Sequence, residues 1–336
     1  MKRKVHKFIF LSLVISLILA GCSENKEKDA PVPQEHILND TVTNESQVIQ
    51  ENQTLQQGER LSSKKNNEVI TSGSNLVKGQ SVQDGTIKEV DKEEYFDGIK
   101  GCMVIYDEEA NEYLIYNKEL ANTQSSPYST FKIMAALIGL QEGVLLSGES
   151  TMGYDGTRYP MDSWNKDLTL EEAFKSSCVW YFRKVINEVG LEKMTQYVKD
   201  FHYGNEDVSE WKGKESDSPE LLKGFWLNSS LKISPKEQVD VLHTLFAGEN
   251  HFSDENKELV KKIMYTDAMN GYEVYGKTGT GNDKAWFVGF FQNEEKTYYF
   301  AVQLEEGQGS GINGYKARTI AYNVIQGFNT KEEVKQ

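Results

Sequence analysis

Aromatic residues are absent from the stretch between Ser23 and Glu94, although the whole chain contains 17 Tyr, 15 Phe and 5 Trp. The same stretch is rich in Asn, Gln, Glu, Lys and Ser. Such a segment cannot bury enough apolar surface to offset the conformational entropy that folding removes. We therefore expect residues 22–94 to form a disordered tether rather than a small domain. The folded core is expected within residues 95–330, and a polar tail follows at 331–336.

The first 21 residues have the pattern of a secretory signal. Basic residues at positions 2–4 and 7 precede an apolar run from Phe8 to Leu19 that is too short to span a membrane comfortably. The run ends in a small-residue cleavage site followed directly by Cys22, which resembles the lipobox of bacterial lipoproteins. That resemblance implies lipidation of Cys22 and an extracytoplasmic protein anchored to a bacterial membrane. The alternative is an ordinary signal peptide with an incidental cysteine. The Asn- and Lys-rich composition favours the cell membrane of a Gram-positive host, whereas Ser23 after the lipidated cysteine would also permit an outer-membrane location in a Gram-negative host.

Charge and cysteine content narrow the function classes. The net charge is −14, and no basic stripe is present for binding nucleic acid. Besides Cys22 only Cys102 and Cys178 remain, and their positions leave open whether they pair. No metal-ligand spacing is present, so we expect no metal. The oligomeric state stays open.

Strand patterns lie at both ends of the folded part, and helix patterns lie between them. Capping boxes at Thr169 and Ser234 begin two helices, and a final helix is expected from about Tyr315 to Gly327. Strands are expected at 101–106 and 113–116, which form a hairpin, and at 273–276, 285–292 and 297–304. This order predicts an α+β fold (an α/β sandwich), with an antiparallel sheet built from both chain ends and an inserted helical lobe. The site should lie where the two parts meet.

One short stretch combines a nucleophile with a base. Ser126 followed by Pro127 is typical of a helix start, with the serine as N-cap. Ser129 and Lys132 then lie on one helical face, so the amine can reach the hydroxyl. Lysine serves as a base only when an apolar setting lowers its pKa, and residues 133–138 provide such a setting. Taken alone, Ser-x-x-Lys also fits an ordinary surface helix.

Two further polar motifs lie in the helical lobe. Ser177 lies in a helical stretch that the Ser176-Ser177 pair can interrupt, and its hydroxyl can relay a proton between a base and a leaving group. A serine inside a helix also often bonds to its own backbone. Tyr203-Gly204-Asn205 predicts a turn near the site, to which we assign no chemical step.

A third motif, Lys277-Thr278-Gly279-Thr280, follows a short predicted strand. Gly279 would let a substrate lie close against the strand edge, where Lys277 and Thr278 can bind a carboxylate. Arg318 on the last helix can add bidentate hydrogen bonds from its planar guanidinium to the same carboxylate. Each feature has a plain alternative, since this tripeptide is common in loops and an arginine on a solvated helix is often simply exposed.

Together and in this order, the motifs resemble the penicillin-recognising serine enzymes, and among them the class D (oxacillinase-type) β-lactamases. The resemblance covers about residues 96–326. The element SDN of class A enzymes is missing. Two departures are Cys178 inside the second motif and Arg318, which lies one position from where the family's arginine would align. The matching motifs are Ser129-Thr130-Phe131-Lys132, Ser177-x-Val179, Tyr203-Gly204-Asn205, Phe225-Trp226-Leu227, Lys277-Thr278-Gly279 and Trp286-Phe287-Val288-Gly289.

The resemblance implies that carbon dioxide carboxylates Lys132, and that the resulting N6-carboxylysine is the general base for acylation and deacylation. Apart from this modification, no cofactor is implied. Carbon dioxide reacts only with a neutral amine, which burial against Phe131, Val179 and Trp226 would maintain. The indole N–H of Trp226 would then donate to the carbamate. Without the motif context, Trp226 would fit plain core packing.

The resemblance also assigns the remaining roles. Ser129 attacks the lactam carbonyl, and the backbone N–H groups of Ser129 and Thr280 form the oxyanion hole. Ser177 passes a proton to the leaving nitrogen. Lys277, Thr278 and Arg318 bind the carboxylate of the drug, with Gly279 between strand and ligand.

The expected function is therefore hydrolysis of the β-lactam ring of penicillin-type antibiotics, which gives resistance. Two alternatives are a β-lactam sensor domain that stays acylated and a lipid-anchored penicillin-binding transpeptidase. Such sensors are normally the outer end of a multi-span membrane protein with a metalloprotease, and this sequence has neither a further apolar span nor a His-Glu-x-x-His motif. Against the transpeptidase, Trp226 makes sense mainly where a carbamate must be held. The sequence leaves open the preference among penicillins, cephalosporins and carbapenems.

Overall fold

The computed structural model describes residues 85–211, 223–248, 250–305 and 311–328. The predicted signal peptide, the lipidation site at Cys22, the tether up to residue 84 and the polar tail lie outside these ranges. Within them, no helix is long and apolar enough to cross a lipid bilayer.

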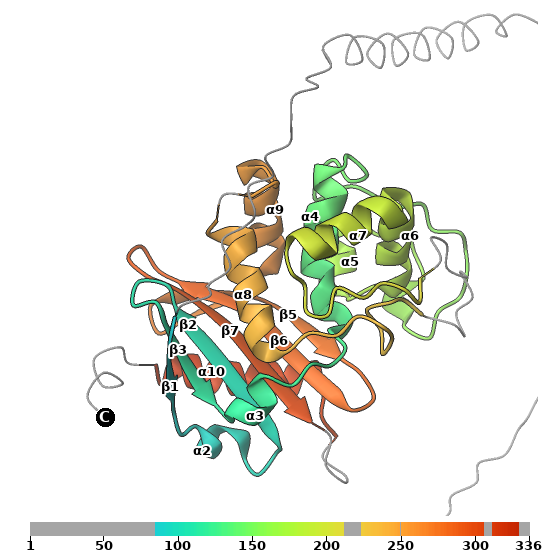
Figure 1. The fold of residues 1–336 in the computed structure, drawn as a ribbon. Helices are drawn as coiled ribbons and strands as arrows, with labels where there is room; N and C mark the ends of the chain where they lie inside the picture. Colours follow the sequence, from blue (N-terminus) through green and yellow to red (C-terminus); the bar gives the residue numbers. More distant parts are fainter. Residues whose placement is uncertain (1–84, 212–222, 249, 306–310, 329–336) are drawn as a thin grey trace, which may run out of the picture. The chain divides into compact units, whose positions relative to one another are not determined.

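A seven-stranded sheet has the strand order β1-β3-β2-β7-β6-β5-β4 (Figure 1). Its neighbouring strands are antiparallel except for β1 and β3, which are parallel. Strand β2, from the start of the folded part, thus pairs with β7 from its end, and one sheet joins both chain ends as predicted. The strands are β1 (Thr86–Glu89), β2 (Gly101–Asp107), β3 (Glu112–Tyr116), β4 (Tyr265–Met269), β5 (Tyr272–Thr280), β6 (Lys284–Gln292) and β7 (Thr297–Glu305).

Helices pack on both faces of the sheet. Helix α10 lies against β5, β6 and β7, and α8 lies against β2, β6 and β7. Helix α4 packs against α6 and α9, and α6 packs against α7, so the middle of the chain forms the predicted helical lobe (Figure 1). The helices are α2 (Glu93–Phe96), α3 (Lys118–Ala121), α4 (Lys132–Gln141), α5 (Leu170–Lys175), α6 (Val179–Val189), α7 (Leu191–Asp200), α8 (Pro235–Phe246), α9 (Asp254–Met264) and α10 (Gly314–Gln326), with the 3₁₀ turns η1 (Tyr128–Phe131) and η2 (Asp162–Trp164).

The apolar core has two parts because side chains alternate between the faces of each strand. On β2, Met103 belongs to the cluster that packs under α10. Its neighbour Val104 belongs to the larger cluster, which includes Leu137 of α4 and Leu242 of α8. The helical lobe therefore shares its core with one face of the sheet.

Both predicted capping boxes are present and begin α5 and α8. The helix start predicted at Ser126 is wrong. Ser126 makes no capping bond, and its hydroxyl instead accepts a hydrogen bond from Lys232 Nζ at 2.9 Å. The α-helix begins at Lys132, after a turn of 3₁₀ helix. The nucleophile candidate Ser129 consequently sits in the tighter turn that precedes the α-helix.

Two strands were not predicted, and a third extends further than expected. Thr86–Glu89 pairs with β3, so regular structure begins before Tyr95, the predicted start of the folded part. Strand β4 was not predicted, since most of its residues are exposed and carry no apolar pattern. Strand β5 continues to Thr280, which places Lys277-Thr278-Gly279 within a strand rather than after one. The final helix, Gly314–Gln326, agrees with the prediction to within one residue at each end.

Gly289 lies where the backbones of β5 and β6 approach each other closely. A Cβ at this position would lie 1.9 Å from the carbonyl oxygen of Tyr275 on the neighbouring strand, whose backbone cannot move without breaking the sheet. We expect Gly289→Ala to lower the free energy of unfolding by about 3 kcal/mol, the upper end of the usual cost of overpacking. Urea titration followed by circular dichroism measures this.

The matched control is Gly148→Ala, because an added Cβ there meets no atom within 4 Å. Its effect should stay within about 0.5 kcal/mol. Equal stability of the two variants would contradict the close strand approach.

Candidate active site

Ser129 and Lys132 form the centre of the site. Lys132 Nζ and Ser129 Oγ lie 2.8 Å apart in a hydrogen bond. Ser129 is half-buried, whereas Lys132 is fully buried at the start of α4. The predicted contact between hydroxyl and amine is therefore present, with the hydroxyl on the accessible side.

Burial lowers the pKa of Lys132 to about 7. Its Nζ lies 5.7 Å from the ring centroid of Phe182 on α6, and the other side chains of α4 around it are apolar. No carboxylate contributes to its pKa, so little in this pocket stabilises the ammonium form. A large share of Lys132 is consequently neutral near pH 7 and able to take a proton.

Aromatic rings close one side of this pocket. Phe131 stacks on Trp226 at a centroid distance of 6.0 Å, and it meets the edges of Tyr203 and Phe225 at 5.3 and 5.1 Å. Val179, the first residue of α6, is buried in the same apolar cluster as Phe131. The motifs that contain Tyr203 and Trp226, which are far from Phe131 in the sequence, thus pack around the residue that precedes Lys132.

Packing does not explain the indole N–H of Trp226, and the same holds for Trp211, whose ring lies 5.6 Å from that of Phe225. The Trp226 N–H is buried, and it has no hydrogen-bond acceptor among the described residues. A buried donor without a partner costs free energy, so its position suits an additional acceptor in the pocket. A carboxyl group on Lys132 would add oxygen acceptors to the same apolar pocket, and the residues present fit that modification.

Ser177 and Lys277 form a second serine–lysine pair. Ser177 lies between α5 and α6 with a left-handed φ of 58°, and its Oγ is in hydrogen-bond contact with Lys277 Nζ. Lys277 is buried, and burial together with the nearby Lys132 holds its pKa well below the ordinary value. Lys277 Nζ also donates to the carbonyl oxygen of Thr278 at 3.1 Å. The Lys277 amine is thus directed at Ser177.

Strand β5 brings its last residues against Pro127 and η1, which together are called the nucleophile turn. A Cβ on Gly279 would lie 3.0 Å from the carbonyl oxygen of Pro127 and 3.2 Å from Thr130 Cγ2. The missing side chain of Gly279 therefore makes room for η1, whereas the sequence analysis expected it to make room for substrate. Thr280 is exposed at the end of the strand, and its Oγ1 accepts a hydrogen bond from Gly314 N at 2.9 Å.

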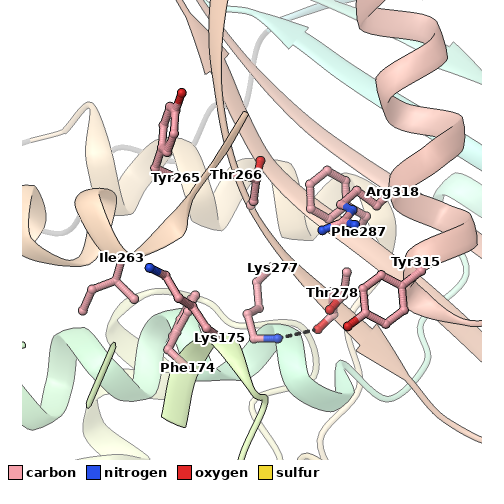
Figure 2. A pocket seen from close by; sticks show the side chains of 11 residues that line it. Phe174, Lys175, Ile263, Tyr265, Thr266, Lys277, Thr278, Phe287, Tyr315 and Arg318 are labelled. Atoms are coloured by element: carbon pink, nitrogen blue, oxygen red, sulfur yellow. Dashed lines mark hydrogen bonds between the residues drawn. The ribbon is translucent and has the colours of Figure 1, made fainter. Parts of the chain in front are cut away.

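Arg318 lies beside a cavity of about 250 Å³ that Lys277 and Thr278 also line (Figure 2). Its guanidinium lies 5.0 Å from the ring centroid of Tyr315 and 5.7 Å from that of Tyr322, an arrangement that orients the planar group. The structure thus brings Arg318 together with the β5 motif, as expected. Tyr315 was not predicted, and its position three residues before Arg318, on the same helical face, was the available signal.

Tyr203-Gly204-Asn205 acts as scaffolding in the structure. Gly204 has a φ of 56°, and a Cβ there would collide with the carbonyl of Lys232. Asn205 exchanges hydrogen bonds with the backbone of Lys232, which joins this turn to the segment before α8.

Gln238 on α8 was missed by the sequence analysis. Its Nε2 donates to Thr130 Oγ1 at 2.8 Å and to the Tyr203 hydroxyl at 3.4 Å, so it connects the nucleophile turn to the scaffold. The available signal was a polar residue on the same helical face as Val241, Leu242 and Leu245.

Two further expectations concern cysteines and metals. Cys102 and Cys178 are both buried and unpaired with each other, so the open question of a disulfide is answered. In the described part of the chain, no cluster of His, Cys, Asp and Glu could hold a metal ion.

Comparison with known protein families gives a match over residues 101–326 to the penicillin binding protein transpeptidase domain. The chain is 34 % identical to the regulatory protein BlaR1 of Bacillus licheniformis over 230 residues, which are 67 % of this chain and 36 % of that protein. It is 31 % identical to the probable β-lactamase YbxI of Bacillus subtilis over 245 residues, which are 72 % of this chain and 86 % of the relative.

Among solved structures, the class D β-lactamase from Bacillus subtilis superposes with a TM-score of 0.64 at 31 % identity, covering 71 % of this chain and 95 % of that one. The chain spans well under half the length of the BlaR1 proteins that it matches, 36 % and 41 % in two species. Both enzymes and regulatory proteins are therefore similar to this chain.

The buried amine of Lys132 makes stability depend on pH. In the unfolded chain the pKa of lysine is near 10.5, so between pH 7 and that value the unfolded state binds more protons than the folded state. Stability should therefore rise with pH in this window, and below pH 7 the full cost of burying a charge remains. We expect Lys132→Met to be more stable than the wild type at pH 7, with this advantage shrinking by about 2 kcal/mol at pH 9.

Urea titrations of both proteins at the two pH values, in buffer freed of carbon dioxide, measure the difference. Apart from Lys277, whose pKa the charge of Lys132 also lowers, the remaining groups titrate alike in both proteins. A difference that stays constant between the two pH values would therefore show that the pKa of Lys132 is not lowered.

Proposed function

The chain belongs to the penicillin-recognising serine enzymes and has class D β-lactamases among its relatives, and on this premise we propose that it hydrolyses the β-lactam ring of penicillin-type antibiotics through an acyl-enzyme on Ser129. Cleavage would confer β-lactam resistance. The observation that carries the proposal is the hydrogen bond between Ser129 Oγ and the buried amine of Lys132, since it joins a nucleophile to a base that is neutral near pH 7.

In the proposed reaction the Ser129 oxygen attacks the lactam carbonyl as Lys132 takes its proton. The backbone N–H groups of Ser129 and Thr280 donate to the oxyanion, and they come from η1 and the end of β5, which pack together. Ser177 passes its proton to the leaving nitrogen and takes up another from the ammonium form of Lys277, with which its hydroxyl is in hydrogen-bond contact. The proton that Lys132 took from Ser129 replaces the one that Lys277 gave. Transfer of the acyl group to water then frees Ser129.

Arg318 and Thr278 are proposed to hold the carboxylate of the drug. Arg318 is always charged, and it lines the same cavity as Thr278. Lys277 contributes less charge than the sequence analysis assigned to it, because its buried amine faces Ser177. We therefore propose that the principal role of Lys277 is to exchange a proton with Ser177.

We further propose that Lys132 is carboxylated by carbon dioxide. The modification would supply a general base for both acylation and deacylation. Two observations support it: the lowered pKa keeps the amine reactive toward carbon dioxide, and Trp226 has a buried indole N–H without an acceptor. We also propose that the protein is extracytoplasmic and anchored through a lipid at Cys22, because its N-terminal sequence has the pattern of a lipoprotein signal.

A second candidate function is β-lactam sensing, because the regulatory BlaR1 proteins are as similar to this chain as the enzymes are. A sensor would be acylated at Ser129 in the same way and would release the product slowly. A penicillin-binding transpeptidase would also be acylated, and the matching domain family includes that activity.

Turnover separates these functions. The wild-type domain from residue 85 onward, mixed with a chromogenic cephalosporin, should release many equivalents of product, and the rate should rise with added bicarbonate. Ser129→Ala should remove turnover, because among the described residues the hydroxyl bonded to the Lys132 amine is that of Ser129. Product that stops at one equivalent, with a stable acyl-enzyme in the mass spectrum, would refute hydrolysis and support sensing or transpeptidation.

Trp226→Phe tests the carboxylation separately. The substitution keeps an aromatic ring in the cluster and removes the indole N–H together with the second ring, a loss of volume that the Trp180→Phe control shares. Hydrogen bonds to charged groups contribute about 1.5–3 kcal/mol, so the bicarbonate concentration that gives half-maximal turnover should rise about 10-fold or more. Trp180→Phe is the matched control, because that indole donates to Trp164 O inside the helical lobe. An unchanged bicarbonate dependence in Trp226→Phe would argue against its contact with a carbamate.

A further inference from the structure

Tyr128, the residue before the nucleophile, has an unusual conformation. It is buried, and its φ of 51° lies in the left-handed region, which bulky residues seldom adopt. Its N–H donates to the carbonyl oxygen of Trp226 at 3.0 Å. Strain of this kind persists only where the surrounding structure enforces it, and it concentrates at functional sites.

The side chain of Tyr128 reaches the turn between β5 and β6. Its hydroxyl donates to Asp283 Oδ1 at 3.0 Å. A Cβ on Gly281 would lie 1.9 Å from Tyr128 Cζ, so the ring lies directly against the backbone of this turn. The turn itself is closed by a hydrogen bond from Gly281 N to Lys284 O at 2.9 Å. One side chain therefore connects the nucleophile turn to the residues just beyond Thr280.

Contacts with the nucleophile turn consequently flank Thr280 on both sides. Before it, Gly279 packs against the carbonyl oxygen of Pro127. After it, Gly281 packs against the ring of Tyr128. The two proposed oxyanion donors, the N–H groups of Ser129 and Thr280, belong to different elements, and an oxyanion hole works only if their separation is held constant.

We infer that Tyr128 is a positioning residue, which through its bond to Asp283 and its contact with Gly281 holds the oxyanion donors of Ser129 and Thr280 at their working separation. The inference rests on the proposed acylation of Ser129. It assigns to Tyr128 an effect on the chemical step and none on the binding of intact substrate, since the hydroxyl is engaged by the protein itself.

The test compares Tyr128→Phe with the wild type in single-turnover acylation by a fluorescent penicillin. Phenylalanine keeps the ring against Gly281 and removes the bond to Asp283. We expect the acylation rate constant to fall about 10-fold, because small misplacements of catalytic groups are costly, while the dissociation constant of the non-covalent complex stays the same. Asp283→Ala should cause the same loss, and combining it with Tyr128→Phe should add nothing further.

Two controls separate positioning from general destabilisation. Asp283→Asn keeps an oxygen acceptor and should retain acylation near the wild-type rate. Tyr106→Phe removes a comparable tyrosine hydrogen bond, to Asn111 Oδ1 at 2.9 Å on the far part of β2, and should leave acylation unchanged.

Wild-type acylation in Tyr128→Phe, or a loss seen only as weaker binding, would overturn the inference and leave the proposed function standing. A wild-type protein that no β-lactam acylates would instead overturn the proposed function, and the inference with it.

Discussion

A lysine amine held neutral in an apolar pocket is the constraint on which the rest of this site depends. Ser129 is an alcohol and becomes a nucleophile only if its proton can leave. The amine 2.8 Å away can accept that proton because burial lowers its pKa to about 7. A solvated lysine in the same position would be charged and would serve only as a hydrogen-bond donor. Burial of Lys132 therefore decides whether Ser129 reacts.

The fold supplies that burial from segments that are distant in sequence. The amine belongs to α4, Phe182 comes from α6, and the rings around Phe131 come from the loops that contain Tyr203 and Trp226. Helix α4 lies in the lobe, while the strand that faces the nucleophile belongs to the sheet. The pocket exists only where the two parts share one core, and this explains why glycine is needed at position 279, where strand and turn touch.

A second buried lysine shapes the chemistry of the site. Lys277 and Lys132 are close enough that the charge of Lys132 lowers the pKa of Lys277. Two ammonium groups in one apolar pocket repel each other, so the pair favours a state with at least one neutral amine. The amine of Lys132 is hydrogen-bonded to the Ser129 hydroxyl, and the amine of Lys277 to the Ser177 hydroxyl. The site thus contains two hydroxyl–amine pairs rather than one. The fixed positive charge at the cavity then comes from Arg318 and from Lys175, whose amine is paired with Glu171.

The sequence by itself determined the reactive pair, the capping boxes that begin α5 and α8, and the sheet built from both chain ends, because these depend on residue types at short spacings. It misplaced the start of α4 and missed β1, β4 and Gln238. Only the tertiary structure decided that Lys277 faces Ser177, that Gly279 accommodates the nucleophile turn, and that Tyr128 reaches Asp283. These relations join residues about 100 or more positions apart, and local propensity contains no information on contacts that form only when the sheet and the helical lobe pack together.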